Sequence, residues 1–396
     1  MRVLSVTAQK PCSTGSGVYL TEVVRSLAKM GVSQAVVAGV TREDRVDMPE
    51  GVTVYPVYFS SEKLPYPVVG MSDEMPYTST RYRDMTEEMA GQFKAAFLEV
   101  LDEAIEKENP DIILCHHLYY LTALIRAHYP AKKVYGFCHN TDLRQMESIL
   151  FERNFIRQEI PKLDRIFALQ EAQKEKIKKI YPVSEKQMTV IGTGYNSEVF
   201  KKTGIKLSRK DGKIRMIFAG KITQKKGVKS LLRALNLLDY EKEKIQLILA
   251  GGAGNLVEYE EIKELADGCR YPVVFAGCVT QARLAELYND CDIFVLPSMY
   301  EGLPLTVIES LACGDRVVMT KLEGIAEWLA DMVPDADIRY VLPPGMKGTD
   351  EPLEEELPAF ESRLAEALRE AIEEKDTKEC DVSRISWQKI AREVIR

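Results

Sequence analysis

One stretch, residues 292–320, constrains the fold more than any other. It reads DIFVLPSMYEGLPLTVIESLACGDRVVMT. The apolar run from Ile293 to Leu296 is typical of a buried parallel strand. Pro304 suits the first turn of a helix, and Gly314 suits the position just after its end. A second apolar strand follows at 316–319, so the stretch is predicted to be a strand–loop–helix–strand unit of an open α/β sheet.

The start of this helix is a predicted ligand site. In open α/β sheets, ligands bind beyond the carboxyl ends of the strands, and the backbone N–H groups of a first helical turn favour anions. Two carboxylates, Glu301 and Glu309, bracket the turn. Glu309 lies about one turn inside the helix, where it would accept hydrogen bonds from nucleotide sugar hydroxyls rather than touch a phosphate, which it would repel. The alternative is that both glutamates are solvated surface groups.

The length of the chain predicts two domains. Its 396 residues suit two domains of about 200 residues each. Strand and helix patterns alternate in both halves, which predicts an α/β fold with two doubly wound, Rossmann-like parallel-sheet domains facing a cleft. The expected domains are residues 1–200 and 213–380. The polar, charged residues 201–213 are the expected linker.

Composition excludes several classes of function. The net charge of −7 and the pI of about 5.5 argue against a nucleic-acid partner. No apolar run approaches 18 residues, and we find no N-terminal signal peptide, so no transmembrane segment is expected. The eight cysteines are scattered without a CxxC pair. Such a distribution is typical of reduced, buried thiols and predicts a cytoplasmic protein, while the oligomeric state stays open.

A glycine-containing loop follows the first predicted strand, residues 2–8. Gly15, Ser16 and Gly17 precede a helix predicted from residue 18, so the backbone there could approach a phosphate or sugar closely. The spacing is not GxGxxG, and a plain tight turn is the alternative. The segment 58–82 is rich in Pro, Tyr and Met and includes Tyr77. Such a segment either lines an acceptor pocket or only packs on the surface.

Three of the four histidines follow predicted strands. His116 and His117 come after strand 111–115, and His139, followed by Asn140, comes after strand 134–138. Carboxyl ends of parallel strands meet at one edge, so these side chains are candidates for the acceptor side of a site, although any one alone would more often be structural. No third ligand of suitable spacing accompanies the His-His pair, so a metal site is not predicted.

Lysines mark two further segments. Lys221 and Lys226 flank the loop after a strand at 214–219, where they could neutralise a diphosphate and stabilise it as a leaving group. The alternative is that both are simply solvated. The helix predicted at 170–180 carries four lysines. It is either a membrane-surface patch or, as the acidic composition favours, a solvated face.

A resemblance adds to these observations. Glu301 and Glu309, with seven residues between them inside PSMYEGLPLTVIESLACG, resemble the E-x7-E signature of retaining GT-B glycosyltransferases, above all glycosyltransferase family 4 or "group 1". Gly220-Lys221-x4-Lys226-Gly227 is similar to the family's Gly-Arg-x4-Lys-Gly, with lysine in place of arginine. The resemblance implies a GT-B fold in which the C-terminal residues 383–396, with Trp387, cross back to the first domain.

The resemblance also implies roles for the donor-side residues. Glu309 would bind the ribose hydroxyls of a nucleotide-sugar donor. Glu301 would lie at the transferring sugar and its leaving phosphate, and Lys226 would hold that phosphate. The helix start would contribute backbone groups, from Leu303, Pro304, Leu305 and Thr306.

Other positions acquire roles in the same way. Ser16 and Gly17 would touch the donor phosphate and the acceptor. His139 would hydrogen-bond the donor sugar and help to place the acceptor. Val279 would contact the nucleobase. Asn140 stands where the family often has an aspartate, so a carboxylate role at that position does not carry over.

The implied activity is transfer of a sugar from a nucleoside-diphosphate sugar, on family frequency a UDP-sugar, to an unknown acceptor. Retention usually indicates double displacement, but the resemblance implies a front-face attack in which the leaving phosphate takes the acceptor proton. Lysines and the helix dipole would replace a metal, and no cofactor is expected. Two rivals remain: a sugar-nucleotide epimerase of the same architecture, and a degenerate transferase that only binds nucleotide sugar.

Overall fold

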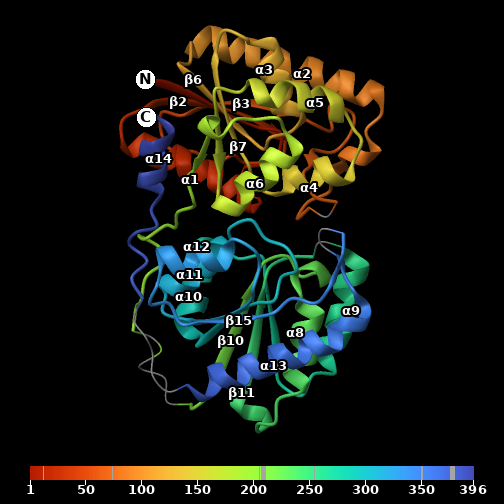
Figure 1. The fold of residues 1–396 in the computed structure, drawn as a ribbon, viewed down its shortest axis with the longest axis vertical. Coiled ribbons are helices and arrows are strands. Elements are labelled where there is room, and N and C mark those ends of the chain that lie inside the picture. Colours follow the sequence, from red (N-terminus) through yellow and green to blue (C-terminus); the bar gives the residue numbers. More distant parts are fainter. Residues whose placement is uncertain are drawn as a thin grey trace. The chain divides into compact units, whose positions relative to one another are not determined.

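The computed structural model describes residues 1–11, 13–73, 75–204, 206, 211–253, 255–348, 351–374 and 380–396. The chain divides into two compact units, residues 1–194 with 386–396, and residues 195–385. Each is an open parallel sheet with helices on both faces, which confirms the predicted pair of Rossmann-like α/β domains (Figure 1). Of the predicted linker 201–213, residues 205 and 207–210 lie outside the described part of the chain.

The sheet of the N-terminal unit has the order β3-β2-β1-β6-β7-β8-β9, and all neighbouring strands are parallel. Its strands are β1 (Arg2–Thr7), β2 (Ser33–Val40), β3 (Thr53–Tyr58), β6 (Ile112–His116), β7 (Lys133–Phe137), β8 (Arg165–Ala168) and β9 (Met188–Val190). The strand order reverses between β1 and β6. This is the switch point at which such sheets bind ligands, beyond the carboxyl ends of the strands.

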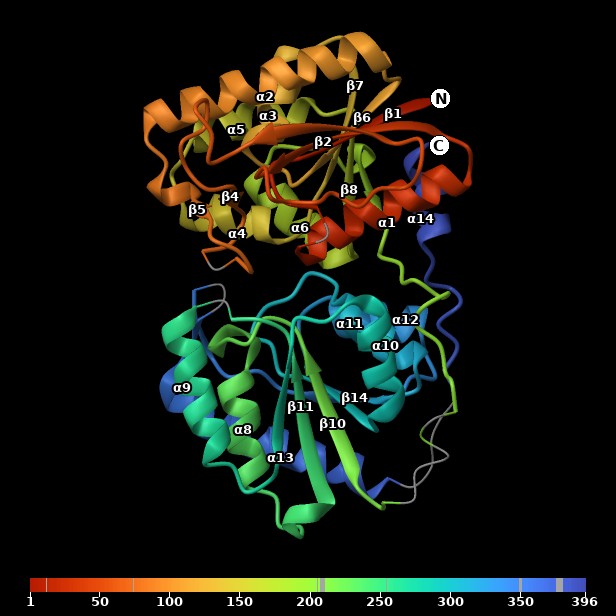
Figure 2. The same cartoon turned by 180° about the vertical axis from the view of Figure 1, so that it is seen from behind.

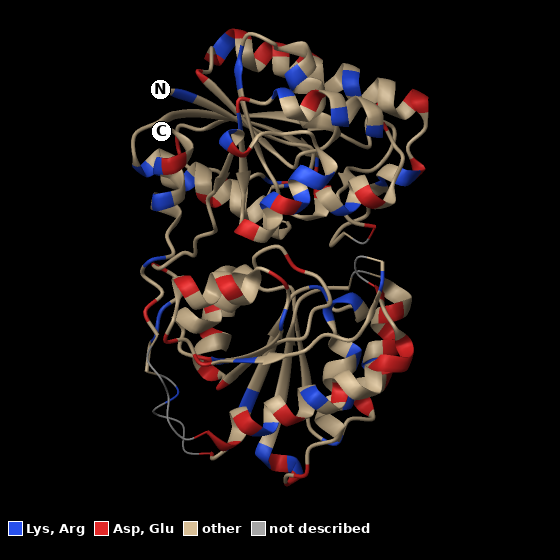
Figure 3. Cartoon of the chain, in the orientation of Figure 1, with Lys and Arg blue, Asp and Glu red and all other residues tan. Residues whose placement is uncertain are grey.

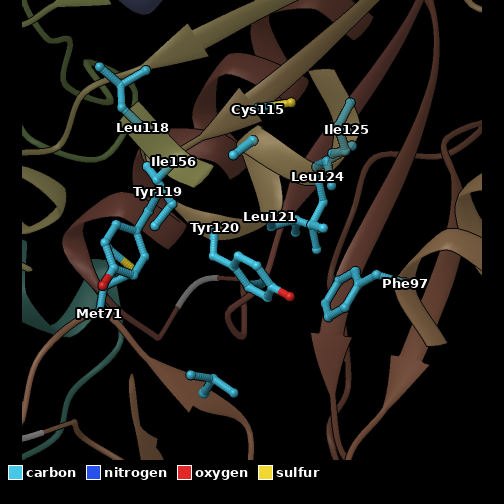
Figure 4. Packing of buried hydrophobic residues seen from close by; sticks show 14 of the residues in the cluster. Met71, Phe97, Cys115, Leu118, Tyr119, Tyr120, Leu121, Leu124, Ile125 and Ile156 are labelled. Atoms are coloured by element: carbon cyan, nitrogen blue, oxygen red, sulfur yellow. The ribbon is translucent and has the colours of Figure 1, made fainter. Parts of the chain in front are cut away.

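The helices of this unit bury the sheet from both sides. They are α1 (Gly15–Lys29), α2 (Glu87–Glu108), α3 (Tyr120–His128), α4 (Thr141–Ser148), α5 (Arg153–Glu159), α6 (Glu171–Ile180) and α14 (Trp387–Val394). Phe97 of α2 and Leu121 and Leu124 of α3 pack into the core beside Cys115 of β6 (Figure 4). Because both faces are covered, β6 is buried along its whole length and β1 is buried at every position but Arg2.

The C-terminal helix α14 belongs to the N-terminal unit and lies beside α1 (Figures 1 and 2). The ring of Trp387 meets that of Tyr19 edge-on, with centroids 4.9 Å apart. A Cβ on Gly194 would lie 2.5 Å from the Trp387 ring, so the chain passes there only as glycine. Trp387 therefore anchors the end of the chain on α1.

One local prediction for this unit was wrong. Helix α1 begins at Gly15 rather than at residue 18, because Thr14 Oγ1 accepts a hydrogen bond from Gly17 N at 3.1 Å and caps the helix. Ser16 and Gly17 therefore lie in a first helical turn and not in a loop. The irregular segment 58–82 also forms β4 (Val69–Gly70), paired with β5 (Thr80–Arg81), and buries much of its apolar surface in the core.

The sheet of the C-terminal unit has the order β12-β11-β10-β13-β14-β15, again with all pairs parallel. Its strands are β10 (Ile214–Ala219), β11 (Ile245–Ala250), β12 (Val273–Gly277), β13 (Ile293–Leu296), β14 (Arg316–Thr320) and β15 (Ile338–Val341). Separately, β16 (Met346–Lys347) pairs antiparallel with β17 (Glu351–Pro352). The switch point lies between β10 and β13.

Among its described residues, six helices of this unit flank the sheet: α8 (Val228–Asn236), α9 (Leu256–Asp267), α10 (Gln281–Asp290), α11 (Leu305–Ala312), α12 (Ile325–Met332) and α13 (Leu357–Glu373). The run β13–α11–β14 is the predicted strand–loop–helix–strand unit. Gly314, with φ +85°, follows the end of α11 as expected.

Charged residues of both signs are spread over the helices, and acidic residues gather on α9 (Figure 3). On α6, Lys174 pairs with Glu171 and Glu185, and Lys178 pairs with Glu175 at 2.5 Å. This ion pairing favours the solvated-face reading of the lysine-rich helix over a membrane patch. Among the described residues, none of the helices has the length and apolarity needed to cross a membrane.

Candidate active site

In the C-terminal unit, the loop after β10 and the loop after β13 meet at the switch point. The backbone N–H of Met299 donates to the carbonyl oxygen of Lys225 at 2.9 Å. Gly227, with φ +73°, lies against Pro297, and a Cβ there would stand 2.0 Å from the Pro297 carbonyl oxygen. The two loops approach this closely only because residue 227 is glycine.

This approach brings Lys226 and Glu301 together. Lys226 Nζ lies 2.6 Å from Glu301 Oε1, and the two side chains are 25% and 14% exposed. Thr223 caps the turn that carries Lys226, accepting its backbone N–H at 3.3 Å. A charge pair in such a half-buried place interacts more strongly than one in open water, so an anion arriving there competes for the Lys226 ammonium.

Glu309 is buried. Its side chain is 6% exposed in α11, one turn from the start of the helix at Leu305. The pKa of Tyr288 is raised well above its usual value, first by the burial of Tyr288 itself and then by the charge of Glu309. The solvated-surface alternative is therefore wrong for Glu309. Pro304 is the residue that precedes α11 rather than its first helical residue, so the first turn starts one position later than predicted.

Lys221 lies in the loop after β10, as Lys226 does, and Val279 follows β12 at the same edge of the sheet. Ile222 N donates to Gly252 O at 3.0 Å, and Gly251 N donates to Gly277 O at 2.8 Å, which links the ends of β10, β11 and β12. Lys221 and Val279 are both half-buried on these loops. The donor-side candidates of the C-terminal unit thus share the carboxyl edge of one sheet.

In the N-terminal unit, the structure brings together the three histidines and Ser16. His116 Nδ1 lies 3.0 Å from His139 Nε2, and the two rings stack with centroids 5.2 Å apart. His117 Nε2 lies 3.1 Å from Ser16 Oγ. The cluster therefore joins the first turn of α1 to the ends of β6 and β7, at the switch point of this sheet.

The histidine cluster is electrically neutral. Burial lowers the pKa of His139 to about 3 and lowers the pKa values of His116 and His117 well below the usual range. Neutral imidazoles can donate and accept hydrogen bonds but cannot balance an anion. In the described part of the chain, no group of three or more His, Cys, Asp or Glu side chains could hold a metal ion.

The remaining acceptor-side candidates, Tyr77 and Asn140, have different surroundings. Tyr77 packs at the edge of the core, with the Lys10 ammonium 5.0 Å from its ring centroid, and Lys10 pairs with Asp44 at 2.7 Å. Asn140 is buried and precedes α4 with φ +72°.

The structure also identifies Asp142, which the sequence did not single out. Its carboxylate accepts hydrogen bonds from the backbone N–H groups of Leu118 and His139, beside the histidine cluster. No sequence motif indicates these hydrogen bonds.

The depressed pKa of His139 predicts a loss of stability in acid. A histidine that folds neutral contributes stability fully above its unfolded pKa of about 6.5, and this stability is lost as pH falls below that value. Between pH 7.5 and 5.5, urea unfolding should show wild type losing up to about 1.4 kcal/mol more than His139→Asn. The comparison isolates the histidine, because Asp315, whose pKa burial raises to about 7, acts in the opposite sense in both proteins. Equal losses in the two proteins would contradict the buried neutral state.

Two family models together match residues 13–356 of the chain. Residues 13–199 match the model described as Glycosyltransferase Family 4, and residues 200–356 match the model described as Glycosyl transferases group 1. The chain belongs to this glycosyltransferase family. The two matches meet near the boundary between the two units, so each model falls mainly within one Rossmann-like domain of the chain.

Curated relatives match this chain over part of their own length. An uncharacterized glycosyltransferase of Methanocaldococcus jannaschii, MJ1607, is 29% identical over 172 residues, which are 41% of this chain and 44% of the relative. Alpha-maltose-1-phosphate synthase of Mycobacterium tuberculosis is 24% identical over 253 residues, which are 58% of this chain and 61% of the relative. The matches thus span about half the length of these relatives.

Solved structures agree with the fold over the whole chain. Sucrose-phosphate synthase from Thermosynechococcus elongatus superposes with a TM-score of 0.70 at 15% identity, covering 100% of this chain and 97% of that one. Anabaena HepE, in complex with UDP and glucose, superposes with a TM-score of 0.64 at 15% identity, covering 100% and 98%. At this identity the likeness concerns the fold alone, and that fold is GT-B.

Proposed function

We propose that this protein is a retaining glycosyltransferase that moves a sugar from a nucleoside-diphosphate sugar to an acceptor hydroxyl. The observation that carries the proposal is the 2.6 Å contact between Lys226 and Glu301 at the carboxyl edge of the C-terminal sheet. It joins a cation suited to a diphosphate with a carboxylate, beside the start of α11, whose N–H groups favour anions.

When the donor binds, oxygens of its diphosphate would replace the Glu301 carboxylate as the partner of the Lys226 ammonium. Lys221 adds a second cation at the same edge, and the first turn of α11 adds backbone donors at Leu305 and Thr306. These groups stabilise the negative charge that develops as the sugar leaves. Lys221 stands where the family has arginine. Its ammonium is a point charge and cannot bind phosphate in the bidentate geometry of a guanidinium.

The transfer would proceed on one face of the sugar. The bond from the anomeric carbon to the leaving phosphate oxygen breaks, and the bond to the acceptor oxygen forms on the same side. The acceptor proton passes to the leaving phosphate, so no protein base and no metal ion is needed. Glu309 would hold the ribose hydroxyls, and the neutral His139 would hydrogen-bond the transferring sugar without taking its charge.

UDP is the proposed nucleotide. HepE, whose fold this chain shares, is described in complex with UDP-glucose. A thermal-shift panel of UDP-, GDP- and ADP-sugars tests the choice, because a ligand at 100 times its Kd stabilises the native state by about 2.7 kcal/mol. UDP-sugars should raise the melting temperature most. An absence of shift with every nucleotide sugar would contradict the proposal.

Incubation of the bound UDP-sugar without acceptor, followed by NMR, separates transfer from the rival activity. The proposal expects the anomeric and ring signals to stay those of the starting sugar. A second set of signals from an epimer would replace the transferase by a sugar-nucleotide epimerase. Release of UDP only when an acceptor is added would support transfer.

A further inference from the structure

Two turns that carry the histidine cluster hold an unusual backbone. His117 has φ +74° and Asn140 has φ +72°, and neither residue is glycine. Residues with a Cβ adopt positive φ only rarely, Asn and His more often than most, and a turn of this kind is strained unless its surroundings stabilise it. His117 ends the β6 side of the cluster, and Asn140 directly follows His139 on the β7 side. Both histidine-bearing turns therefore need an external constraint.

The carboxylate of Asp142 supplies that constraint. Its side chain is 0% exposed, and its Oδ2 accepts the backbone N–H of Leu118 at 2.7 Å. Oδ1 and Oδ2 also accept the backbone N–H of His139, at 3.2 and 3.3 Å. Leu118 is the residue after His117. One buried side chain thus ties the turn after β6 to the turn after β7.

Further donors surround the same carboxylate. The backbone N–H of Leu143 donates to Oδ1 at 3.2 Å, and the Cys138 thiol donates to it at 3.4 Å. All the contacts described for Asp142 come from donors. An ionised carboxylate, which only accepts, satisfies all of them, whereas an amide would turn an N–H2 group toward a backbone N–H. Desolvation raises the pKa of Asp142, and these hydrogen bonds act against that rise.

We propose that Asp142 is a positioning residue for the glycosyl transfer. By fixing the backbones of His117 and His139, it holds the 3.0 Å contact between His116 and His139 and the 3.1 Å contact between His117 and Ser16. This inference rests on the proposed function, since His139 acts on the sugar only if the protein is a transferase. Pre-organised hydrogen-bonding groups of this kind work only when held within a narrow range of positions.

The test compares Asp142→Asn with a matched control, Asp164→Asn. Asp164 also accepts a backbone N–H of β7, from Val134 at 2.8 Å, but at the opposite end of the strand. In protein labelled with 15N-histidine, Asp142→Asn should shift or broaden the ring signals of His117 and His139. It should also lower kcat at least tenfold while the donor KM changes less than twofold. Asp164→Asn should leave the ring signals in place.

Unchanged ring signals and kcat in Asp142→Asn would overturn the inference, as would the same ring changes in Asp164→Asn. Should Asp142→Asn fail to fold, the double variant with Asn140→Gly keeps the test open, because glycine accepts φ +72° without strain. The double variant should fold and still show displaced ring signals. Calorimetric binding of UDP-glucose to wild type is a separate readout, and its absence would count against the proposed function while leaving the ring signals to decide the role of Asp142.

Discussion

Replacing Lys226 by alanine is expected to lower kcat/KM for the nucleotide-sugar donor by about two to three orders of magnitude. The change removes the ammonium that would carry the leaving diphosphate. It also leaves the Glu301 carboxylate, 14% exposed and 2.6 Å from the lost ammonium, without this partner beside an anionic substrate. Steady-state kinetics with the donor varied at a fixed acceptor concentration measure the effect.

Lys229 offers a matched control one turn along the chain. It pairs with Glu261 at the same 2.6 Å, but on α8 and with Glu261 more than half exposed. Lys229→Ala should leave kcat/KM within about twofold, because a surface ion pair contributes little. Lys226→Arg should retain most activity, since arginine also binds phosphate. Activity of Lys226→Ala within threefold of wild type would show that the diphosphate binds elsewhere.

Replacing Gly227 by alanine is expected to destabilise the C-terminal unit by about 2–5 kcal/mol. Part of the loss is the strain of a Cβ at φ +73°, and the rest is the clash 2.0 Å from the Pro297 carbonyl oxygen. The clash can be relieved only by separating the two loops that bring Lys226 and Glu301 together. Urea unfolding measures the stability, and donor binding should weaken in the same variant.

Gly212→Ala separates the two causes. Gly212 has a similar φ of +66°, but a Cβ there would meet nothing within 4 Å. This control should lose only about 1–2 kcal/mol and keep full donor binding. Equal losses in the two variants would mean that the loops adjust freely, and that Gly227 is needed for its backbone angle alone.

More of the architecture than of the site could be predicted from the sequence. Apolar runs and helix-capping signals are local, so the unit β13–α11–β14 could be predicted from residues 292–320 alone. The gathering of His116, His117 and His139 followed from one rule, that parallel strands end at a common edge. The start of α1 was misplaced because Thr14 caps the helix four residues before the apolar pattern begins.

The contacts that define the site depend on the folded chain. The pairing of Lys226 with Glu301 joins residues 75 positions apart, and no spacing rule forecasts a 2.6 Å contact. The role of Asp142 could not be predicted from the sequence. Side chains of many residue types can accept a backbone N–H, so this role has no sequence motif of its own. The burial of Glu309 was also unforeseen, since a glutamate near a helix start is usually exposed.

The burial of Glu309 places the strictest condition on its proposed role. At 6% exposure, its carboxylate meets a ligand only where the first turn of α11 leaves an approach. Isothermal titration of UDP into wild type, Lys226→Ala, Glu309→Gln and the control Lys229→Ala tests the central claim directly. We predict that UDP binds wild type and Lys229→Ala alike, and that Lys226→Ala and Glu309→Gln each raise the Kd more than tenfold. Equal affinity of UDP for all four proteins would contradict a nucleotide site at this edge of the C-terminal sheet.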